Sequence, residues 1–166
     1  MRALKAFGYV LIMTSAPMWV RPAYADCSGT HPNRTPTTRF VIHDGQVYDT
    51  RTKLTWQRCS VGQTWRGSAG CVGAIDQMSW SDAMSRATDG WRLPTKDELA
   101  TLISPACRNP AINEEAFPGM ALDKLWYWSS TPYDDSTAWN VGFGHGSIYG
   151  CFRWFANSVR LVRSNR

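Results

Sequence analysis

The clearest alternation of apolar and polar positions lies between residues 40 and 57, in the stretch FVIHDGQVYDTRTKLTWQ. Short β-branched and aromatic runs stand on either side of Asp44-Gly45, a dipeptide that is the strongest short signal for a β-hairpin. A second polar turn at residues 50–52 separates the next run. The pattern therefore predicts a small antiparallel meander and a folded domain that begins near Arg39.

The next apolar positions recur at helical spacing. Ser79 is a candidate N-cap, and Gly90 follows soon after the last position of the series. Because the helical period places positions i, i+3, i+4 and i+7 on one face, we expect one amphipathic helix of about nine residues. The four apolar positions are Trp80, Ala83, Met84 and Ala87.

A second helix is predicted from the segment GWRLPTKDEL, which covers residues 90–99. Thr95 and Glu98 have the spacing of a capping box, in which each side chain accepts a hydrogen bond from a backbone N–H at the helix start. The apolar residues that follow keep helical spacing. They are Leu99, Leu102 and Ile103.

The residues just before this cap have an extended pattern. Trp91 and Leu93 are two positions apart, so both would face the same way and could cover the new helix as a hydrophobic staple. The competing interpretation is a site in which Arg92, Lys96 or Asp97 performs chemistry. A turn, an extended dipeptide, a cap and a helix start explain the segment more simply, so we expect a scaffold.

Beyond the second helix, short aromatic or β-branched runs predict an antiparallel sheet. Trp139, Val141 and Phe143 share a face by the period of two, and we expect them in the core. Asn140 and Gly142 would then face outward or toward a loop. Strands, two short helices and a further small twisted sheet, in that order, predict an α+β fold. The runs are LWYWSST, TAWNVGF, GSIYG and SVRLVR.

The first 25 residues have the pattern of a secretory signal peptide. Basic residues precede an apolar run, and Ala23-Tyr24-Ala25 offers a small-x-small cleavage site. No stretch reaches the roughly 18 consecutive apolar residues that a membrane span needs. We therefore expect a removed segment 1–25, an extended arm 26–38 and one domain 39–166, exported through the secretory pathway to the periplasm or the cell surface.

The charge balance does not favour a nucleic-acid ligand. The chain carries 18 basic and 13 acidic residues, but three basic residues lie in the signal segment, which leaves a net charge of +2. After Asp135 there is no further acidic residue, while four arginines follow. Such a basic end either attracts anions or forms a solvated strand face. The arginines are Arg153, Arg160, Arg163 and Arg166.

All five cysteines follow the signal segment, and an oxidising compartment favours disulfides over metal ligation. No two of them have the spacing of a zinc knuckle. Cys59 and Cys71 flank a loop rich in Gly and Ser, and we expect this pair to be bonded. One of Cys27, Cys107 and Cys151 is then left as a free thiol or as a link to another chain.

Six blocks occur in an order that resembles one known family. The blocks are RFVIHDGQVYDTRTKLTWQRCSVGQTW, WRLPTKDEL, PAINEEAFP, YWSSTPY, AWNVGF and VRLVR. Over nearly all of residues 36–163, this order resembles the C-terminal domain of the Legionella collagen-like adhesins. The resemblance implies a C-type-lectin-like fold, distantly similar to the formylglycine-generating sulfatase-modifying enzymes, and binding of sulfated glycosaminoglycans.

The same resemblance implies a second disulfide, between Cys27 and Cys107, with Cys151 unpaired. The alternative pair, Cys107 with Cys151, would tie the exit of the second helix to the sheet and leave Cys27 free. The sequence shows no Gly-x-y collagen stalk, so avidity of the adhesin type would need another source of oligomerisation.

Motifs for a metal or an enzyme are missing from the chain or incomplete. The strand motif of calcium-dependent lectins is matched by Trp139-Asn140 without the carboxylate that follows it, and Asp134-Asp135 is typical of a turn. An oxidase of the related fold would need paired late cysteines or clustered histidines, and the chain has neither. Hydrolase and phosphate-loop motifs do not occur. We expect no metal, no cofactor and no enzymatic activity.

The remaining class is a binding module. A sulfated glycan suits guanidinium groups for its charges and aromatic planes for its sugar faces. The candidate ligand-binding residues are Tyr133, Asn140, His145, Tyr149, Arg153 and Trp154. The competing interpretation is that the late aromatic residues only pack the last hairpin. We expect a lectin-like or adhesin-like module for anionic glycans; an envelope- or pilus-associated protein-binding module is the alternative, and an oxidase ranks third.

Overall fold

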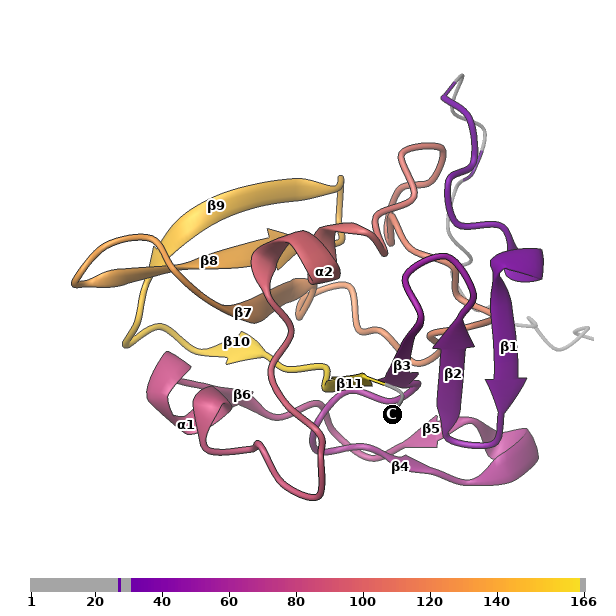
Figure 1. Cartoon of the computed structure of the whole chain (residues 1–166), viewed down its shortest axis with the longest axis horizontal. Coiled ribbons are helices and arrows are strands. Elements are labelled where there is room, and N and C mark those ends of the chain that lie inside the picture. The colour runs from indigo at the N-terminus through magenta and orange to yellow at the C-terminus, as the bar shows by residue number, and fades with distance from the viewer. Residues whose placement is uncertain (1–26, 28–30, 165–166) are drawn as a thin grey trace, which may run out of the picture.

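The computed structural model describes residue 27 and residues 31–164, so the predicted signal segment 1–25 lies outside the described residues. The described part is an α+β fold with three small sheets and two disulfides (Figure 1). This class agrees with the sequence, while the C-type-lectin-like assignment stays a prediction. No helix in the described part is long and apolar enough to cross a membrane.

The helices are η1 (Thr37–Arg39), η2 (Gly67–Ala69), α1 (Trp80–Met84) and α2 (Lys96–Ala100). The strands are β1 (Phe40–His43), β2 (Gln46–Asp49), β3 (Leu54–Gln57), β4 (Thr64–Trp65), β5 (Cys71–Val72), β6 (Gln77–Met78), β7 (Trp126–Pro132), β8 (Thr137–Gly142), β9 (Ser147–Phe152), β10 (Asn157–Ser158) and β11 (Val162–Ser164).

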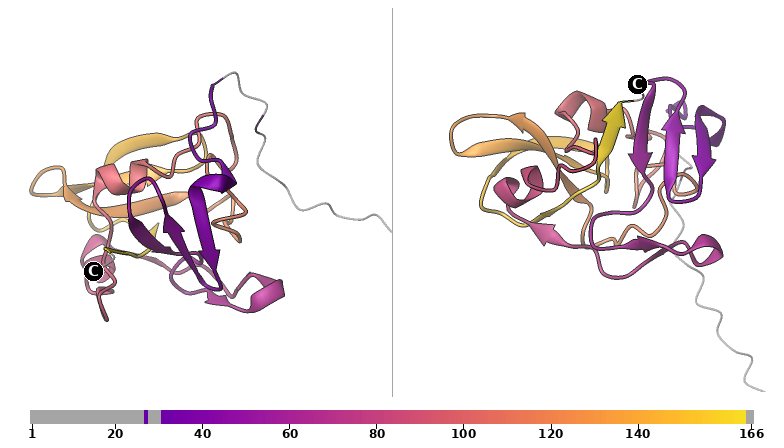
Figure 2. Two further views of the ribbon diagram at one scale, coloured as in Figure 1. Left: turned by 45° about the vertical axis from the view of Figure 1, so that its right-hand side comes forward. Right: turned by 60° about the horizontal axis from the view of Figure 1, so that its bottom comes forward.

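The first sheet has the order β1-β2-β3-β11 and contains the predicted meander. Its hairpin turns at Asp44, whose positive φ of 45° suits an aspartate in a tight turn. The last strand, β11, pairs with β3, so the C-terminal end of the described chain lies beside the N-terminal meander (Figure 2).

The second sheet has the order β6-β10-β7-β8-β9. It is mixed, because Ser158 of β10 pairs in parallel with Tyr127 of β7, which corrects the expectation of a purely antiparallel sheet. The chain leaves β9 at the sheet edge, passes β8 and β7, and enters between β6 and β7. Because of this return, β10 runs parallel to β7 and its residues lie beside that strand (Figure 1).

The segment GWRLPTKDEL is a scaffold. Thr95 and Glu98 form both bonds of the capping box of α2. Arg92 adds two hydrogen bonds of 2.7 Å to the same carboxylate, one to each oxygen. Burial acts to raise the pKa of Glu98, but the bonds from Arg92 and from the Thr95 backbone outweigh it and hold the pKa below its usual value. The Arg92 side chain therefore has a structural role, because it stabilises the start of α2 through Glu98.

Helix α1 is shorter than predicted. Ser79 caps it by accepting a hydrogen bond from the Asp82 backbone, but the helix ends at Met84. The next backbone bonds, at Arg86 and Ala87, are of the i→i+3 type, and they lead into the turn that returns the chain at Gly90. Helix α1 is therefore four residues shorter than expected, because the backbone after Met84 forms a tight turn instead.

The predicted staple packs elsewhere. Trp91 and Leu93 do lie on one side, yet both pack in the cluster of Ala83 and Trp128, while Leu99 of α2 belongs to the other apolar cluster. The lead-in therefore covers the second sheet, and the inner face of α2 packs into the core between the sheets.

Two apolar clusters cover opposite faces of the second sheet. One contains Tyr127 and Val141 and extends to the first sheet, α2 and the loop before β7. The other contains Trp128 and Ala138 and lies under α1. Trp126 points to the same side as Trp128, because side chains two apart on a strand share a face. Trp126 is not part of the second cluster, and it is exposed to solvent at this end of the sheet.

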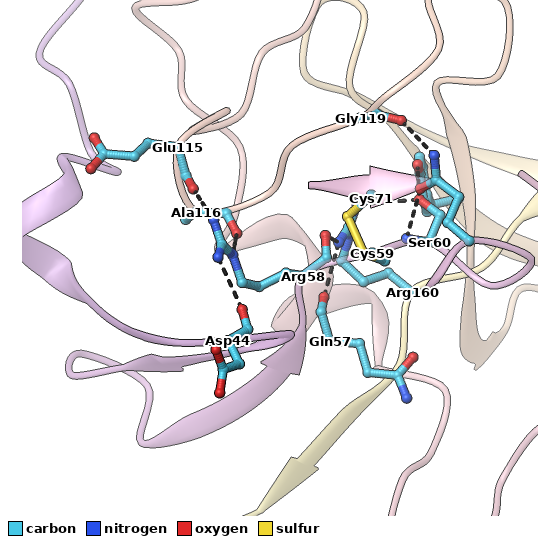
Figure 3. Close-up of a disulfide and its surroundings, with 12 residues drawn as sticks. Asp44, Gln57, Arg58, Cys59, Ser60, Cys71, Glu115, Ala116, Gly119 and Arg160 are labelled. Carbon is cyan, nitrogen blue, oxygen red and sulfur yellow. Dashed lines mark hydrogen bonds between the residues drawn. A yellow bond between two sulfur atoms is a disulfide. The ribbon is translucent and has the colours of Figure 1, made fainter. Parts of the chain in front are cut away.

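Two buried arginines, Arg58 and Arg160, lie near the Cys59–Cys71 disulfide (Figure 3). Arg160 is fully buried, which corrects the expectation of a solvated face: its guanidinium donates to the carbonyl oxygens of Gln57 and Arg58 and to Ser60 Oγ. Burial lowers the pKa of Arg160. The side chain therefore ties the C-terminal segment to the end of β3.

Arg58 makes the second of these connections. Its guanidinium donates to the carbonyl oxygens of Asp44, Glu115 and Ala116, and stacks over the Trp65 ring with its central carbon 4.0 Å from the centroid. Hairpin, disulfide loop and the loop before β7 are thereby held together (Figure 3).

The N-terminal arm docks on the domain. Arg39 and Asp49 form a buried ion pair with two hydrogen bonds, and Arg39 also reaches the Thr101 carbonyl at the end of α2. The Asn113 side chain donates to the Thr35 carbonyl. Cys27 is bonded to Cys107 in the same region, so residues of the predicted arm are part of the packed structure.

Candidate binding site

Five exposed aromatic side chains extend along the second sheet, from Trp126 at the start of β7 to Phe152 at the end of β9, beside the start of β8. Between 39% and 72% of each residue is exposed. Their ring contacts form two groups: Trp126 and Tyr149 have centroids 5.8 Å apart, and Trp154 stacks on Phe155 and on Phe152, with centroids 4.4 and 6.0 Å away. We call this set the aromatic surface. It consists of Trp126, Tyr149, Phe152, Trp154 and Phe155.

A recess of about 290 Å³ lies within the aromatic surface. Trp126, Tyr149 and Phe155 form its walls, and the buried amides of Asn140 and Asn157 lie at its base. The glycine at position 142 permits this arrangement, since a Cβ atom there would come within 2.7 Å of the Trp126 ring. A small residue opposite Trp126 thus lets the indole cover the sheet.

Trp126 also borders a second recess, of about 260 Å³. His145, Asp123 and Asn109 are among the residues that line it. The two recesses share Trp126 as a common wall, so a chain-like ligand could contact both from one aromatic platform.

The structure places two of the six predicted residues directly in the first recess. Asn140 and Tyr149 stand opposite each other in the β8–β9 pairing, so their side chains share a face of the sheet. Asn140 is 3% exposed, so of the two expected orientations, outward or toward a loop, the second agrees with the structure: the segment that follows β9, with Phe155 and Asn157, covers it.

Arg153 fixes the base of the β8–β9 hairpin. Its guanidinium donates to the carbonyl oxygens of Asp134 and Thr137 and lies over the Trp80 ring, with its central carbon 4.4 Å from the centroid. Among the described residues, no carboxylate forms an ion pair with Arg153. Its positive charge is therefore positioned but not neutralised, one residue from Trp154.

The remaining predicted residues are divided between the two faces of the sheet. Trp154 belongs to the aromatic surface, and His145 borders the neighbouring recess. Tyr133 packs edge-on against Trp139, with centroids 4.7 Å apart, on the face opposite Tyr149. The six residues therefore do not form one site.

The competing interpretation is that four late aromatic residues pack the last hairpin; three of them do stack on one another, but none is buried. Tyr149, Phe152, Trp154 and Phe155 are all exposed. Trp139, which we expected in the core together with Val141 and Phe143, is only partly buried, between Tyr133 and Lys96.

The Asp134-Asp135 pair forms a turn. Asp134 accepts hydrogen bonds from the backbone of Ser136 and of Thr137, at 2.8 Å each, and from the Ser136 hydroxyl. These bonds, that of the Ser136 backbone first, lower the pKa of Asp134. Within residues 31–164 and at Cys27, no three His, Cys, Asp or Glu side chains gather as a metal site would require.

Five of the seven residues that line the first recess were not assigned to ligand binding from the sequence, among them Trp126, Phe155 and Asn157. The signal for Trp126 was present, because Trp126 and Trp128 alternate with Tyr127 and both faces of β7 are aromatic. No local signal marks Phe155 or Asn157, since their position depends on the return of the chain past β8 and β7.

Fold and surface together define a disulfide-stapled α+β domain with an exposed aromatic surface, which is the character of a binding module. A family model described as the Lcl C-terminal domain matches residues 45–163, and the chain belongs to this family. This is the family of the collagen-like adhesins that the sequence blocks resemble. A search of curated proteins found no match.

Proposed function

We propose that the chain is an exported, non-enzymatic binding module that recognises glycans, with sulfated chains as its preferred class. The observation that carries the proposal is the aromatic surface, in which five exposed rings extend along the second sheet. Aromatic planes suit the apolar faces of sugar rings. Membership of a collagen-like adhesin family supports a binding role.

Arg153 supports the preference for sulfate. A guanidinium can donate two parallel hydrogen bonds to an oxyanion, and the Arg153 charge has no ion-pair partner among the described residues. Its position beside Trp154 would let one ligand contact a ring and a charge together. Because the charge lies at the surface, binding should weaken as salt screens it.

The two disulfides support export, because such bonds persist in oxidising compartments. The periplasm or the cell surface is the proposed location. The described residues offer no clustered metal ligands, and the proposal accordingly assigns no metal or cofactor to the glycan contact.

A glycan array probed with residues 26–166 tests the proposal. The array should contain sulfated glycosaminoglycans and their desulfated counterparts, and the binding should be repeated with a chelator and at raised salt. We expect binding to sulfated chains that persists in chelator and weakens with salt. Equal binding to the desulfated chains would remove the preference for sulfate.

Matched variants assign the effect to the surface. Trp154→Ala should abolish most binding, and Arg153→Ala should weaken binding to sulfated chains by about tenfold, as expected for one charge-assisted hydrogen bond. Arg51→Ala removes the same charge from an exposed turn of the first sheet and should have little effect. Equal losses for Arg153→Ala and Arg51→Ala would indicate attraction by net charge alone.

The exposure of Trp154 favours a second candidate, a protein partner in the cell envelope. A tryptophan exposed over 72% of its surface is typical of a binding hot spot at a protein interface. Absence of binding to every glycan on the array would overturn the first proposal and favour this one.

A further inference from the structure

The recess between Trp126, Tyr149 and Phe155 is lined by Asn140, and one polar atom of the Asn140 side chain lacks a partner. Oδ1 of Asn140 is buried and accepts no hydrogen bond from the described residues. A buried acceptor without a partner costs about 1–3 kcal/mol. A ligand that donates a hydrogen bond to this atom would therefore recover free energy that the free protein lacks.

The other buried amide of the recess is already engaged. Nδ2 of Asn157 lies 3.7 Å from Sγ of Cys151, within reach of a weak hydrogen bond. Cys151 is the free cysteine of the five, and its partly buried thiol also lines the recess. The Asn140 side chain is thus the amide that remains able to accept a hydrogen bond from a ligand. The reactivity of the Cys151 thiol can report whether the recess is occupied.

The chemistry of the lining selects the ligand class. None of the seven residues that line the recess is charged. A sulfate group has no donor for Oδ1 of Asn140 and would lose its hydration against aromatic walls, so it is disfavoured there. A ligand with an N–H donor, a small apolar group and a ring face matches the acceptor and the walls together.

The size of the recess sets a further limit. Pockets for drug-sized ligands measure roughly 300–1,000 Å³, so a recess of about 290 Å³ suits a single ring with one substituent. A sugar residue that carries an acetamido group meets these requirements, because that group supplies an N–H and a methyl.

We propose that this recess is a subsite for an uncharged N-acetylhexosamine residue. Its amide N–H donates to Oδ1 of Asn140, and its methyl group and ring face pack against Trp126, Tyr149 and Phe155. The inference rests on the proposed glycan-binding function and adds the sugar that enters the recess. Sulfate groups of a longer chain would remain outside, where Arg153 can reach them.

Protection of Cys151 tests the inference. The folded, oxidised protein is alkylated with iodoacetamide in the presence of di-N-acetylchitobiose or of cellobiose, which has the same linkage but hydroxyl groups in place of acetamido groups. We expect chitobiose to slow alkylation of Cys151 in a saturable way. Cellobiose should bind about fivefold more weakly, as expected for one lost hydrogen bond.

Three variants separate recognition from folding. Asn140→Leu keeps the volume and removes the unpaired acceptor, so the protein should stay as stable as the wild type while protection by chitobiose is lost. Tyr149→Ala removes an exposed wall and should also lose protection. Tyr133→Ala removes a similarly exposed tyrosine from the opposite face and should keep it.

The outcomes distinguish the two proposals. Binding to sulfated chains without protection of Cys151 by chitobiose would overturn the subsite and leave the proposed function standing. Protection by chitobiose without binding to sulfated chains would support the subsite and remove the preference for sulfate. Failure of both would overturn both. Protection by N-acetylphenylalanine amide, with none by chitobiose, would identify the recess as a pocket for a peptide side chain and overturn the subsite.

Discussion

The indole ring of Trp126 lies so close to Gly142 that a Cβ atom at residue 142 would approach within 2.7 Å of it. The two residues are also paired across β7 and β8. The position of the main aromatic wall is therefore set by a residue that contributes no side chain, and this relationship can be tested without substituting any residue proposed to contact the ligand.

Gly142→Ala should displace the Trp126 ring and weaken glycan binding. Overpacking costs about 1–3 kcal/mol, and we expect the lower end because Trp126 is partly exposed and can move away. Glycan binding, tryptophan fluorescence and thermal unfolding measure the effect. Gly144→Ala is the matched control, since the nearest atom to its Cβ would lie at 3.7 Å, an ordinary contact. Equal binding by the two variants would contradict a role for the position of Trp126.

The Asp49–Arg39 pair should make stability depend on pH. Burial acts to raise the pKa of Asp49, but hydrogen bonds from Arg39, Thr52 and the Arg51 backbone outweigh it and hold the pKa below its usual value. A lowered folded pKa means that this contribution is present above the unfolded pKa of about 3.9 and is lost as the pH falls through the folded pKa.

Asp49→Asn should therefore destabilise the protein by about 3–5 kcal/mol at neutral pH, because it leaves a buried guanidinium without its partner. Urea unfolding between pH 2 and 7 should show the wild-type and variant curves converging on the acid side. Asp97→Asn, at an exposed carboxylate, should change the free energy of unfolding by less than about 0.5 kcal/mol. A constant difference at all pH values would contradict the assignment.

Arg160 should be essential for stability. Arg160→Met leaves the carbonyl oxygens of Gln57 and Arg58 without a buried donor, and each unsatisfied group costs about 1–3 kcal/mol. We expect a loss of at least about 3 kcal/mol in the free energy of unfolding, measured with urea. Arg160→Lys should rescue this only in part, since an ammonium lacks the planar fork.

Arg163→Met is the control for this series, because Arg163 is partly exposed on the neighbouring strand and donates to Gln46 at the surface. It should cost less than about 1 kcal/mol. Similar losses for the substitutions at 160 and 163 would mean that lost positive charge, not unsatisfied carbonyl groups, explains the effect.

The two disulfides should differ in their contribution. Cys59 and Cys71 are separated by 12 residues, and the chain-entropy model gives about 3 kcal/mol for a loop of that size. Cys27 and Cys107 are separated by 80 residues, for which the same model gives about 4.5 kcal/mol. Unfolding of the two double alanine variants measures both losses. A larger loss for the short loop would show that local packing around Arg58 and Arg160 outweighs chain entropy.

Local patterns in the sequence predicted much of the fold. The hairpin at Asp44, the capping box of Thr95 and Glu98, and the bonded pair Cys59–Cys71 all depend on residues near one another in the chain. The predicted length of α1 was wrong, because residues that the apolar period assigns to the helix form the turn that ends at Gly90.

The site was predicted in part. Tyr149 follows from its place in an aromatic strand, and the structure places it on the recess together with Asn140. The period-two alternation placed Asn140 on the face of the sheet that Val141 does not occupy. It could not show that a later segment of the chain covers that face. Phe155 and Asn157 reach the recess only because β10 lies beside β7.

The sequence by itself determined the α+β class, the local turns and caps, and, through six ordered blocks, the family to which the chain belongs. The tertiary structure alone decided that Arg160 is buried, that Asn140 is enclosed beneath a wall of aromatic rings, and that Tyr133 faces away from them. The physical reason is that turns and caps depend on residues a few positions apart, whereas burial and shared surfaces depend on which distant strands become neighbours.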